Sequence, residues 1–162
     1  MSNKSIEYFR SLFGNFPTGI TVVGITFENE PRGITANSIT SVSLEPMLLL
    51  VCIAKQASSH QILKDVGLFS VNFLSENQRA ASQFFASSSD EQKNLMSDFK
   101  YTIGQNGSPI LLDTIGWTEC KVVDWFSGGD HSIVLGEVTN FSLESESLKP
   151  LVYYQGKYST LS

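Results

Sequence analysis

Small polar side chains crowd the segment 35–43. Six of its nine residues carry a short hydroxyl or amide group, and they fall on both faces of the strand that the segment would form. A half-buried strand needs polar residues only on its wet face, so this pattern is typical of a segment that leaves its backbone open to a flat heteroaromatic ligand. A Thr-rich edge strand explains the same composition, since threonine is a good strand former. Taken alone, the segment favours the edge strand.

A second candidate lies where an apolar strand ends and a helix begins. Cys52 and Ile53 belong to the apolar run, Lys55 follows it, and the helix is predicted to begin at Ser58 or Ser59. Free N–H groups and the positive end of the helix dipole meet at that point, which predicts a site for a phosphate group. The alternative is an ordinary serine N-cap beside a solvated lysine.

The third candidate is the run Gly128-Gly129-Asp130-His131. Its two glycines predict a tight hairpin turn, which places His131 where the next strand begins. Because His131 is one of only two histidines in the chain, it is a candidate to contact a ligand or to donate a hydrogen bond to one. The alternative is a polar residue that flanks a turn.

Composition narrows the classes of function. The 162 residues are enough for one domain, 1–162, with a real core. The net charge is −5 and no Lys/Arg patch occurs, which argues against nucleic acid as a partner. Cys52 and Cys120 lie in apolar runs and no Cys/His cluster occurs, so we expect no metal site. Only 17% of residues are charged, and a homo-oligomer that buries part of the apolar surface is the simplest explanation.

Targeting signals and familiar cofactor motifs are also missing from the sequence. Residues 1–10 lack the apolar core of a signal peptide, and the longest apolar run, Met47–Ala54, is too short to span a bilayer. We therefore expect a cytoplasmic protein with reduced thiols and no membrane partner. No Rossmann fingerprint, nucleophile elbow or P-loop occurs, so a cofactor would need another kind of site.

The spacing of apolar residues predicts a mainly β chain. Helices are expected at about 5–12, at 59–66 and after Ser75, where Gln78 completes a capping box. An exposed loop is expected at 87–91, and turns at 29–31 and 128–129. The segments with strand character are 20–27, 33–43, 47–54, 69–74, 117–125, 132–141 and 151–158. A closed antiparallel barrel would remove the sheet edges of such a chain.

Taken in order, these segments resemble the flavin reductase-like family, the FMN-binding split barrels that serve as reductase components of two-component flavin monooxygenases. The resemblance extends from about Phe9 to Tyr158. Its motifs are Phe16-Pro17-Thr18-Gly19-Ile20-Thr21-Val22-Val23, Gly33-Ile34-Thr35-Ala36-Asn37-Ser38, Ser41-Val42-Ser43-Leu44-Glu45-Pro46, Leu50-Val51-Cys52-Ile53, Phe69-Ser70-Val71-Asn72-Phe73-Leu74, Gly129-Asp130-His131-Ser132-Ile133-Val134-Leu135-Gly136-Glu137-Val138 and Pro150-Leu151-Val152-Tyr153-Tyr154.

This resemblance implies a six-stranded Greek-key split β-barrel with flanking helices, assembled as a homodimer with two flavin sites at its interface. It implies FMN or FAD as the flavin, NADH or NADPH as the electron donor, and a flavin-dependent monooxygenase as a partner. By the same resemblance, the flavin ring and ribityl chain contact Thr35, Ala36, Asn37, Ser38 and Ser41. Cys52 and Ile53 bind through their backbone, the phosphate faces Lys55, Ser58 and Ser59, and His131 lies beside the ring and the incoming nicotinamide.

The resemblance favours an NAD(P)H:flavin oxidoreductase, and two other functions stay open. A non-enzymatic electron carrier or flavin reservoir would bind flavin and never admit nicotinamide. A small barrel for an unrelated apolar ligand would bind no flavin. The lack of an obvious acid–base pair does not decide among them, because hydride transfer between two stacked rings requires positioning and no proton transfer.

Overall fold

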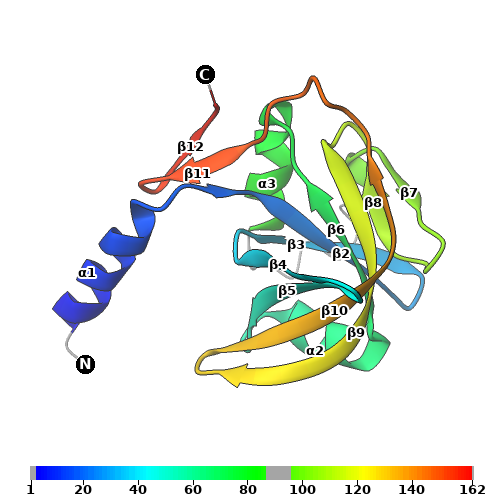
Figure 1. Cartoon of the computed structure of the whole chain (residues 1–162), viewed down its shortest axis with the longest axis horizontal. Coiled ribbons are helices and arrows are strands. Elements are labelled where there is room, and N and C mark those ends of the chain that lie inside the picture. The colour runs from blue at the N-terminus through cyan, green and yellow to red at the C-terminus, as the bar shows by residue number, and fades with distance from the viewer. Residues whose placement is uncertain (1–2, 87–95, 162) are drawn as a thin grey trace.

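A curved antiparallel sheet of seven strands forms the body of the protein in the computed structural model, which describes residues 3–86 and 96–161 (Figure 1). The strand order is β3-β2-β6-β9-β10-β5-β4. The strands are β2 (Thr21–Phe27), β3 (Glu30–Ala36), β4 (Ile39–Leu44), β5 (Met47–Ala54), β6 (Leu68–Phe73), β9 (Gly116–Gly128) and β10 (His131–Leu143).

Smaller elements surround this sheet. β1 (Thr18–Gly19), β11 (Val152–Tyr154) and β12 (Lys157–Ser159) make a three-stranded sheet, and β7 (Tyr101–Ile103) pairs with β8 (Pro109–Leu111). The helices are α1 (Asn3–Gly14), α2 (Ser58–Val66) and α3 (Arg79–Phe85), with short 3₁₀ turns at Glu76–Gln78 and Met96–Asp98. No helix in the described part of the chain is long and apolar enough to cross a membrane.

The mainly β class with flanking helices is confirmed, but the main sheet has seven strands and not six, and it is not the closed barrel predicted, because β3 and β4 stay unpaired with each other at its two ends. The predicted strand 33–43 is two strands, because the chain leaves the ladder at Asn37 and Ser38. β3 pairs with β2, whereas β4 pairs with β5, so the two halves lie at opposite ends of the strand order. The polar residues on both faces of this segment thus belong to two strands and the break between them.

Other predicted boundaries shift at turns. The first hairpin turns at Glu28 and Asn29, whose φ angles are 52° and 62°, so Glu30 and Pro31 already belong to β3. The predicted strand 151–158 is a hairpin, with its turn at Gln155-Gly156. The loop predicted at 87–91 lies outside the described residues.

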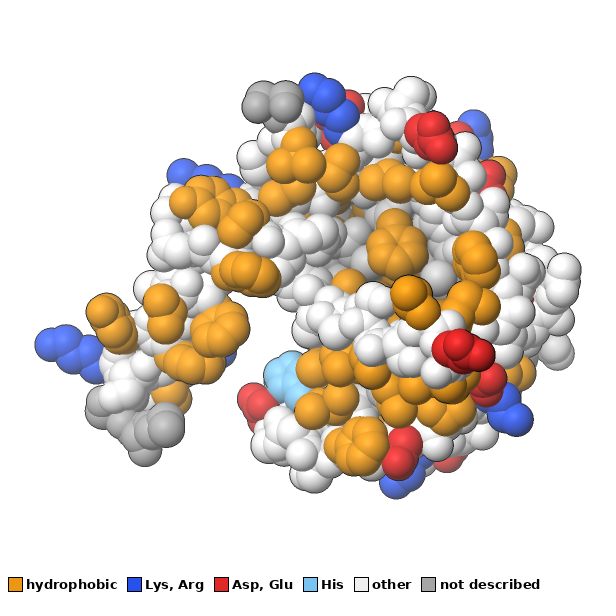
Figure 2. All heavy atoms as spheres, viewed as in Figure 1, with side chains coloured by type: hydrophobic (Ala, Val, Ile, Leu, Met, Phe, Trp, Pro, Cys, Tyr) orange, Lys and Arg blue, Asp and Glu red, His pale blue; other side chains and the backbone are white. Residues whose placement is uncertain are grey.

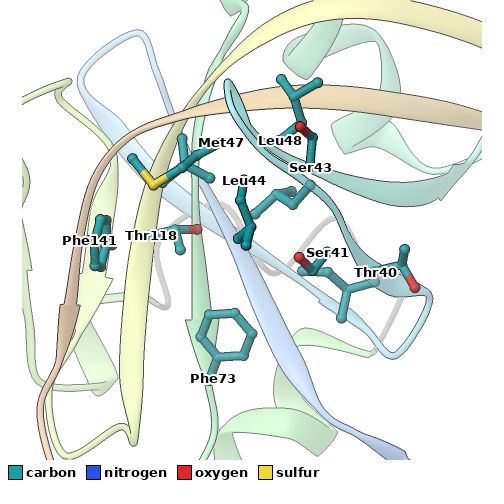
Figure 3. A pocket seen from close by; sticks show the side chains of 12 residues that line it. Thr40, Ser41, Ser43, Leu44, Met47, Leu48, Phe73, Thr118 and Phe141 are labelled. Carbon is teal, nitrogen blue, oxygen red and sulfur yellow. The ribbon is translucent and has the colours of Figure 1, made fainter.

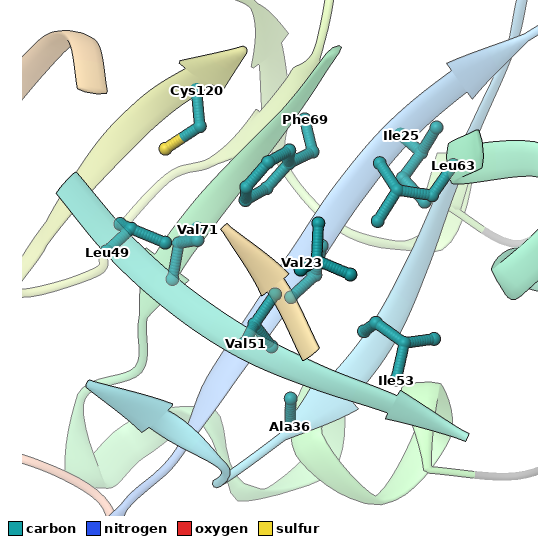
Figure 4. Close-up of a cluster of buried hydrophobic side chains, with 11 residues drawn as sticks. Val23, Ile25, Ala36, Leu49, Val51, Ile53, Leu63, Phe69, Val71 and Cys120 are labelled. Atoms are coloured by element: carbon teal, nitrogen blue, oxygen red, sulfur yellow. The ribbon is translucent and has the colours of Figure 1, made fainter. Parts of the chain in front are cut away.

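The main core fills the concave side of the sheet. Val23, Val51, Phe69 and Val71 are fully buried there, and Leu63 of α2 inserts into the same cluster (Figure 4). In β5 buried residues alternate with half-buried ones, so this continuous apolar run is an ordinary strand with one face in the core. A second cluster packs α3 and the C-terminal segment against the other side of β2, through residues that include Val22, Phe85 and Leu151.

A buried carboxylate fastens the loop between β7 and β8 to the sheet. Glu119 of β9 is completely buried, and its carboxylate accepts hydrogen bonds from the backbone N–H of Asn106 at 2.7 Å and from Nδ2 of Asn140 at 2.8 Å. Gly104 passes so close to Glu119 that a Cβ there would overlap Oε1 of its carboxylate. This loop therefore packs on the sheet through a polar contact, and the glycine makes the close approach possible.

The two predicted helix boundaries inside the chain are mostly confirmed. Ser75 and Gln78 form the expected capping box before α3. α2 ends at Gly67, whose φ of 69° lets its N–H reach the carbonyl of Leu63. The residue that precedes the first turn of α2 is Ala57 and not a serine, so no side chain caps this helix.

α1 extends away from the sheet and buries none of its residues (Figure 1). Tyr8 is 80% exposed, and Phe9, Leu12 and Phe13 are at least 60% exposed. These side chains gather along the helix in Figure 2, and the rings of Phe9 and Phe13 lie 4.8 Å apart. An apolar patch of this kind marks an interaction surface.

Candidate functional site

The three candidate segments meet at the end of β5. β10 pairs with β5 so that His131 lies opposite Ala54 and Ile133 lies opposite Cys52. Residues directly opposite in an antiparallel pair point to the same face, so the side chains of His131 and Cys52 share the face turned away from the core. Ile53, only 1% exposed, points into the core and can offer a ligand only its backbone.

The break between β3 and β4 lies against this same strand end. The N–H of Cys52 donates to the carbonyl of Ser38 at 3.1 Å, and Oγ of Ser38 donates to the carbonyl of Cys52 at 3.0 Å. Asn37 is exposed, and its Nδ2 donates to Oγ1 of Thr18 at 3.2 Å. Asn37 and Ser38 are therefore open to a ligand beside the end of β5, whereas the N–H of Cys52 is already bonded.

The other residues of the hydroxyl-rich segment lie elsewhere. Oγ1 of Thr35 donates to the carbonyl of Ser82 in α3 at 2.7 Å, and Thr35 and Asn37 both line a small cavity of about 180 Å³. Ala36 is only 8% exposed and belongs to the core. Ser41 pairs with the buried Leu49, so it faces the concave side of the sheet and not the side of His131.

An apolar pocket of about 520 Å³ opens on that concave side (Figure 3). Of the predicted site residues, only Ser41 belongs to it. The lining comes from β4, β5, β6, β9 and β10, and consists of Ile39, Thr40, Ser41, Ser43, Leu44, Met47, Leu48, Leu49, Phe73, Thr118, Val138 and Phe141. Sequence reasoning missed this pocket because its lining comes from five strands that only the folded sheet brings together.

The start of α2 leaves backbone donors without a side-chain cap, because Ala57 has no side-chain oxygen. Ser58 is exposed and Ser59 is half-buried. Lys55 lies just before this helix, but its ammonium already donates to the carbonyl of Gly129 at 2.7 Å and to Oγ of Ser127 at 3.2 Å. Lys55 thus joins the helix start to the hairpin turn that carries His131.

Asp130 orients the ring of His131. Nδ1 of His131 lies 2.8 Å from Oδ1 of Asp130, with the carboxylate exposed to solvent. The hydrogen bond from His131, together with the charge of that ring, lowers the pKa of Asp130. Nδ1 of His131 donates to the ionised Asp130, so Nε2 is the ring nitrogen that remains available to a ligand on the other side of the ring.

His60, the other histidine, is a site residue that the sequence analysis did not single out. Its Nε2 lies 2.8 Å from Oγ of Ser132, the residue after His131, and its ring meets that of Trp125 edge-on at 5.4 Å. Burial lowers the pKa of His60, and the charges of Lys64 and Lys55 lower it further. His60 is therefore the neutral ring that connects α2 to β10.

Neither thiol has the environment of a nucleophile. Burial raises the pKa of Cys52, although a hydrogen bond with Ser38 opposes the shift. Burial also raises the pKa of Cys120 to about 11. A reactive cysteine requires a lowered pKa and access to solvent, so the chemistry of this site does not pass through sulfur.

Comparison with known proteins identifies the family. A family model described as "Flavin reductase like domain" matches residues 13–162. The chain belongs to this family. Its similarity to a probable flavin reductase of Rhizobium meliloti (strain 1021) is 41% identity over 152 residues, which cover 93% of this chain and 47% of the relative.

Two further similar proteins have names that state their activity. The reductase component of the flavin-dependent trigonelline monooxygenase of Acinetobacter baylyi is 37% identical over 97% of this chain and 49% of its own length. The chain thus spans about half the length of these two curated relatives. The NADH:FAD oxidoreductase of Streptomyces globisporus C-1027, solved in complex with NAD and FAD fragments, superposes with a TM-score of 0.91 at 35% identity, covering 100% of this chain and 96% of that one.

Proposed function

We propose that this chain is an NAD(P)H:flavin oxidoreductase whose site lies at the end of β5. The observation that supports this most is that one strand end gathers the exposed amide and hydroxyl of Asn37 and Ser38, the uncapped start of α2 and the ring of His131. A flavin nucleotide needs groups of these kinds for its ring, its ribityl chain and its phosphate. Membership of the flavin reductase family supports the same activity.

The residues fit a flavin in two regions. Asn37 and Ser38 would bond the ring and ribityl chain at the end of β5, beside the backbone of Cys52 and Ile53. Thr35, Ala36 and Ser41 belong to the set that the family resemblance implies, but Ala36 packs in the core and Ser41 faces the concave side of the sheet, so the proposed contacts at this strand end do not include them. Ser58 and Ser59 would face the phosphate at the positive end of α2, where the charge of Lys55 also favours an anion. The uncapped N–H groups of α2 are the structural observation that supports a phosphate there.

When bound, the flavin supplies a ring that accepts hydride from a reduced nicotinamide. What the chain must supply is orientation. His131, held by Asp130, would contact the nicotinamide and fix its approach to the ring. No side chain needs to transfer a proton in that step.

For the specific cofactors we propose FAD and NADH, with FMN and NADPH as the alternatives to be compared. The support is the similarity to the Streptomyces globisporus NADH:FAD oxidoreductase over nearly the whole of both chains. We also propose that a flavin-dependent monooxygenase receives the reduced flavin, since the Acinetobacter baylyi relative is the reductase component of such a system.

We further propose that the protein works as a homodimer. The apolar side chains of α1 contact no core of their own chain, and Leu44 beside the apolar pocket is 85% exposed. A symmetric pair would cover such surfaces on both copies at once. Sedimentation at micromolar concentration should give twice the 17.9 kDa mass of the chain. A folded monomer that binds flavin would contradict this proposal.

The activity is tested by mixing the flavin-loaded protein with NADH or NADPH in a stopped-flow instrument without oxygen. We expect the oxidised-flavin absorption at about 450 nm, a property of the cofactor, to bleach rapidly, and faster with NADH. Binding of flavin without bleaching by either nucleotide would favour the electron carrier. Failure to bind FAD, FMN or riboflavin would favour a barrel for an unrelated ligand.

A further inference from the structure

One short segment at the start of α2 forms several hydrogen bonds with the hairpin turn between β9 and β10. The backbone N–H of Lys55 donates to the carbonyl of Asp130 at 2.9 Å, and its ammonium donates to Gly129 and Ser127. Five residues later, His60 bonds Oγ of Ser132. The residues immediately before and after His131 are therefore both bonded to the segment 55–60.

This arrangement matters because the turn extends past the last paired residue of β5. Ala54 is opposite His131 and ends β5, whereas Gly129 and Asp130 form the exposed tip of the hairpin (Figure 1). The neighbouring strand supports the ladder only as far as His131. Beyond that point, Lys55 makes the contacts that a continued strand would otherwise provide, with two of the three donors of its ammonium bonded to residues of the hairpin.

We propose that Lys55 is a positioning residue for His131, fixing the turn on which that ring is carried whether or not a phosphate lies at the start of α2. This inference rests on the proposed function for its effect on rate. Lys55 could affect the protein in two distinct ways, as a ligand of the phosphate or as a support of the turn. A phosphate ligand acts on the affinity of flavin nucleotides, whereas a positioning residue acts on hydride transfer to any flavin, including riboflavin, which has no phosphate.

The test compares Lys55→Met with Lys64→Met, an exposed lysine of α2 whose loss changes the net charge equally. We expect Lys55→Met to slow hydride transfer roughly tenfold to a hundredfold, the effect of misplacing a reacting group, with riboflavin and FAD alike. The affinity of the variant for riboflavin should stay within about threefold of the wild-type affinity, because a residue that acts on the transition state changes the rate and not the binding of the flavin. Lys64→Met should match the wild type, and Lys55→Arg should recover most of the rate because guanidinium can donate to Gly129.

A second measurement does not depend on activity. In flavin-free protein, amide hydrogen exchange over 127–132 should become faster in Lys55→Met, while exchange in the core strand β6 should stay unchanged. If exchange at the turn does not change, the positioning of His131 by Lys55 is refuted even when FAD affinity falls. An effect confined to the affinity of phosphate-bearing flavins would likewise overturn the proposal and leave Lys55 as a phosphate ligand. If the wild type reduces no flavin, the proposed function fails, and the exchange result still decides whether Lys55 holds the turn.

Discussion

Replacing Glu119 by alanine would remove the acceptor that fastens the loop between β7 and β8. The carboxylate is completely buried and binds two donors, the N–H of Asn106 and Nδ2 of Asn140. In Glu119→Ala both donors, which belong to half-buried residues, lose their acceptor, at up to about 1–3 kcal/mol each. Since burial of a carboxylate is itself unfavourable, its removal offsets part of that loss. We expect the free energy of unfolding to fall by roughly 1–5 kcal/mol.

Urea denaturation followed by circular dichroism measures this change, since the midpoint shifts while the slope stays constant if both variants unfold as one unit. Glu144→Ala is the matched control, because its exposed carboxylate also accepts an N–H, from Nε1 of Trp117 at 2.9 Å. Water can replace that acceptor, so we expect a change within about 0.5 kcal/mol. If Glu119→Ala and Glu144→Ala shifted the midpoint equally, burial of the Glu119 contact would not determine its contribution.

Three further predictions concern the proposed site. His131→Ala should slow hydride transfer from NADH about tenfold to a hundredfold and leave flavin affinity within about threefold, and a variant as fast as the wild type would make 128–131 only a turn. Ser58→Asp combined with Ser59→Asp should weaken binding of FAD far more than binding of riboflavin, because the added carboxylates repel only the phosphate, and equal losses in a fluorescence titration would remove the phosphate from α2. The lowered pKa of His60 means that unfolding takes up a proton at slightly acid pH, so its stabilising contribution is complete above about 6.5, the unfolded value, and is lost as the pH falls below it. Between pH 7 and pH 5 the urea midpoint should therefore fall more for the wild type than for His60→Gln, and equal falls would show that folding does not lower the pKa of His60.

Local signals in the sequence were sufficient where one segment determines its own structure. The capping box of Ser75 and Gln78 follows from the preferences of a few adjacent residues, and so does the β9–β10 hairpin, whose turn is at Gly129-Asp130, one residue later than predicted. The break at Asn37 and Ser38 did not, because a hydroxyl-rich strand and two strands with different partners have the same local pattern. Only the pairing of β3 with β2 and of β4 with β5 distinguishes them.

The candidate site, too, was predicted only in part from the sequence. The sequence placed Ser38, Lys55 and His131 in three separate motifs, and the structure brings them to one strand end through pairing between β5 and β10. It did not reveal that Ser41 faces the other side of the sheet, since a strand pattern does not say which face is the inner one when both are polar. The contact between His60 and Ser132 joins residues 72 positions apart, and no local pattern predicts it.

The two-residue break between β3 and β4 has a mechanical consequence. These strands are the first and last in the order of the sheet, yet they are neighbours in sequence, so a covalent link through Asn37 and Ser38 joins the two ends. In the pairing found, β3 bonds only β2 and β4 bonds only β5. The seam is thus closed by the chain and not by a ladder of hydrogen bonds. A molecule bound between β3 and β4 would connect the two free edges of the sheet and make the whole sheet more rigid.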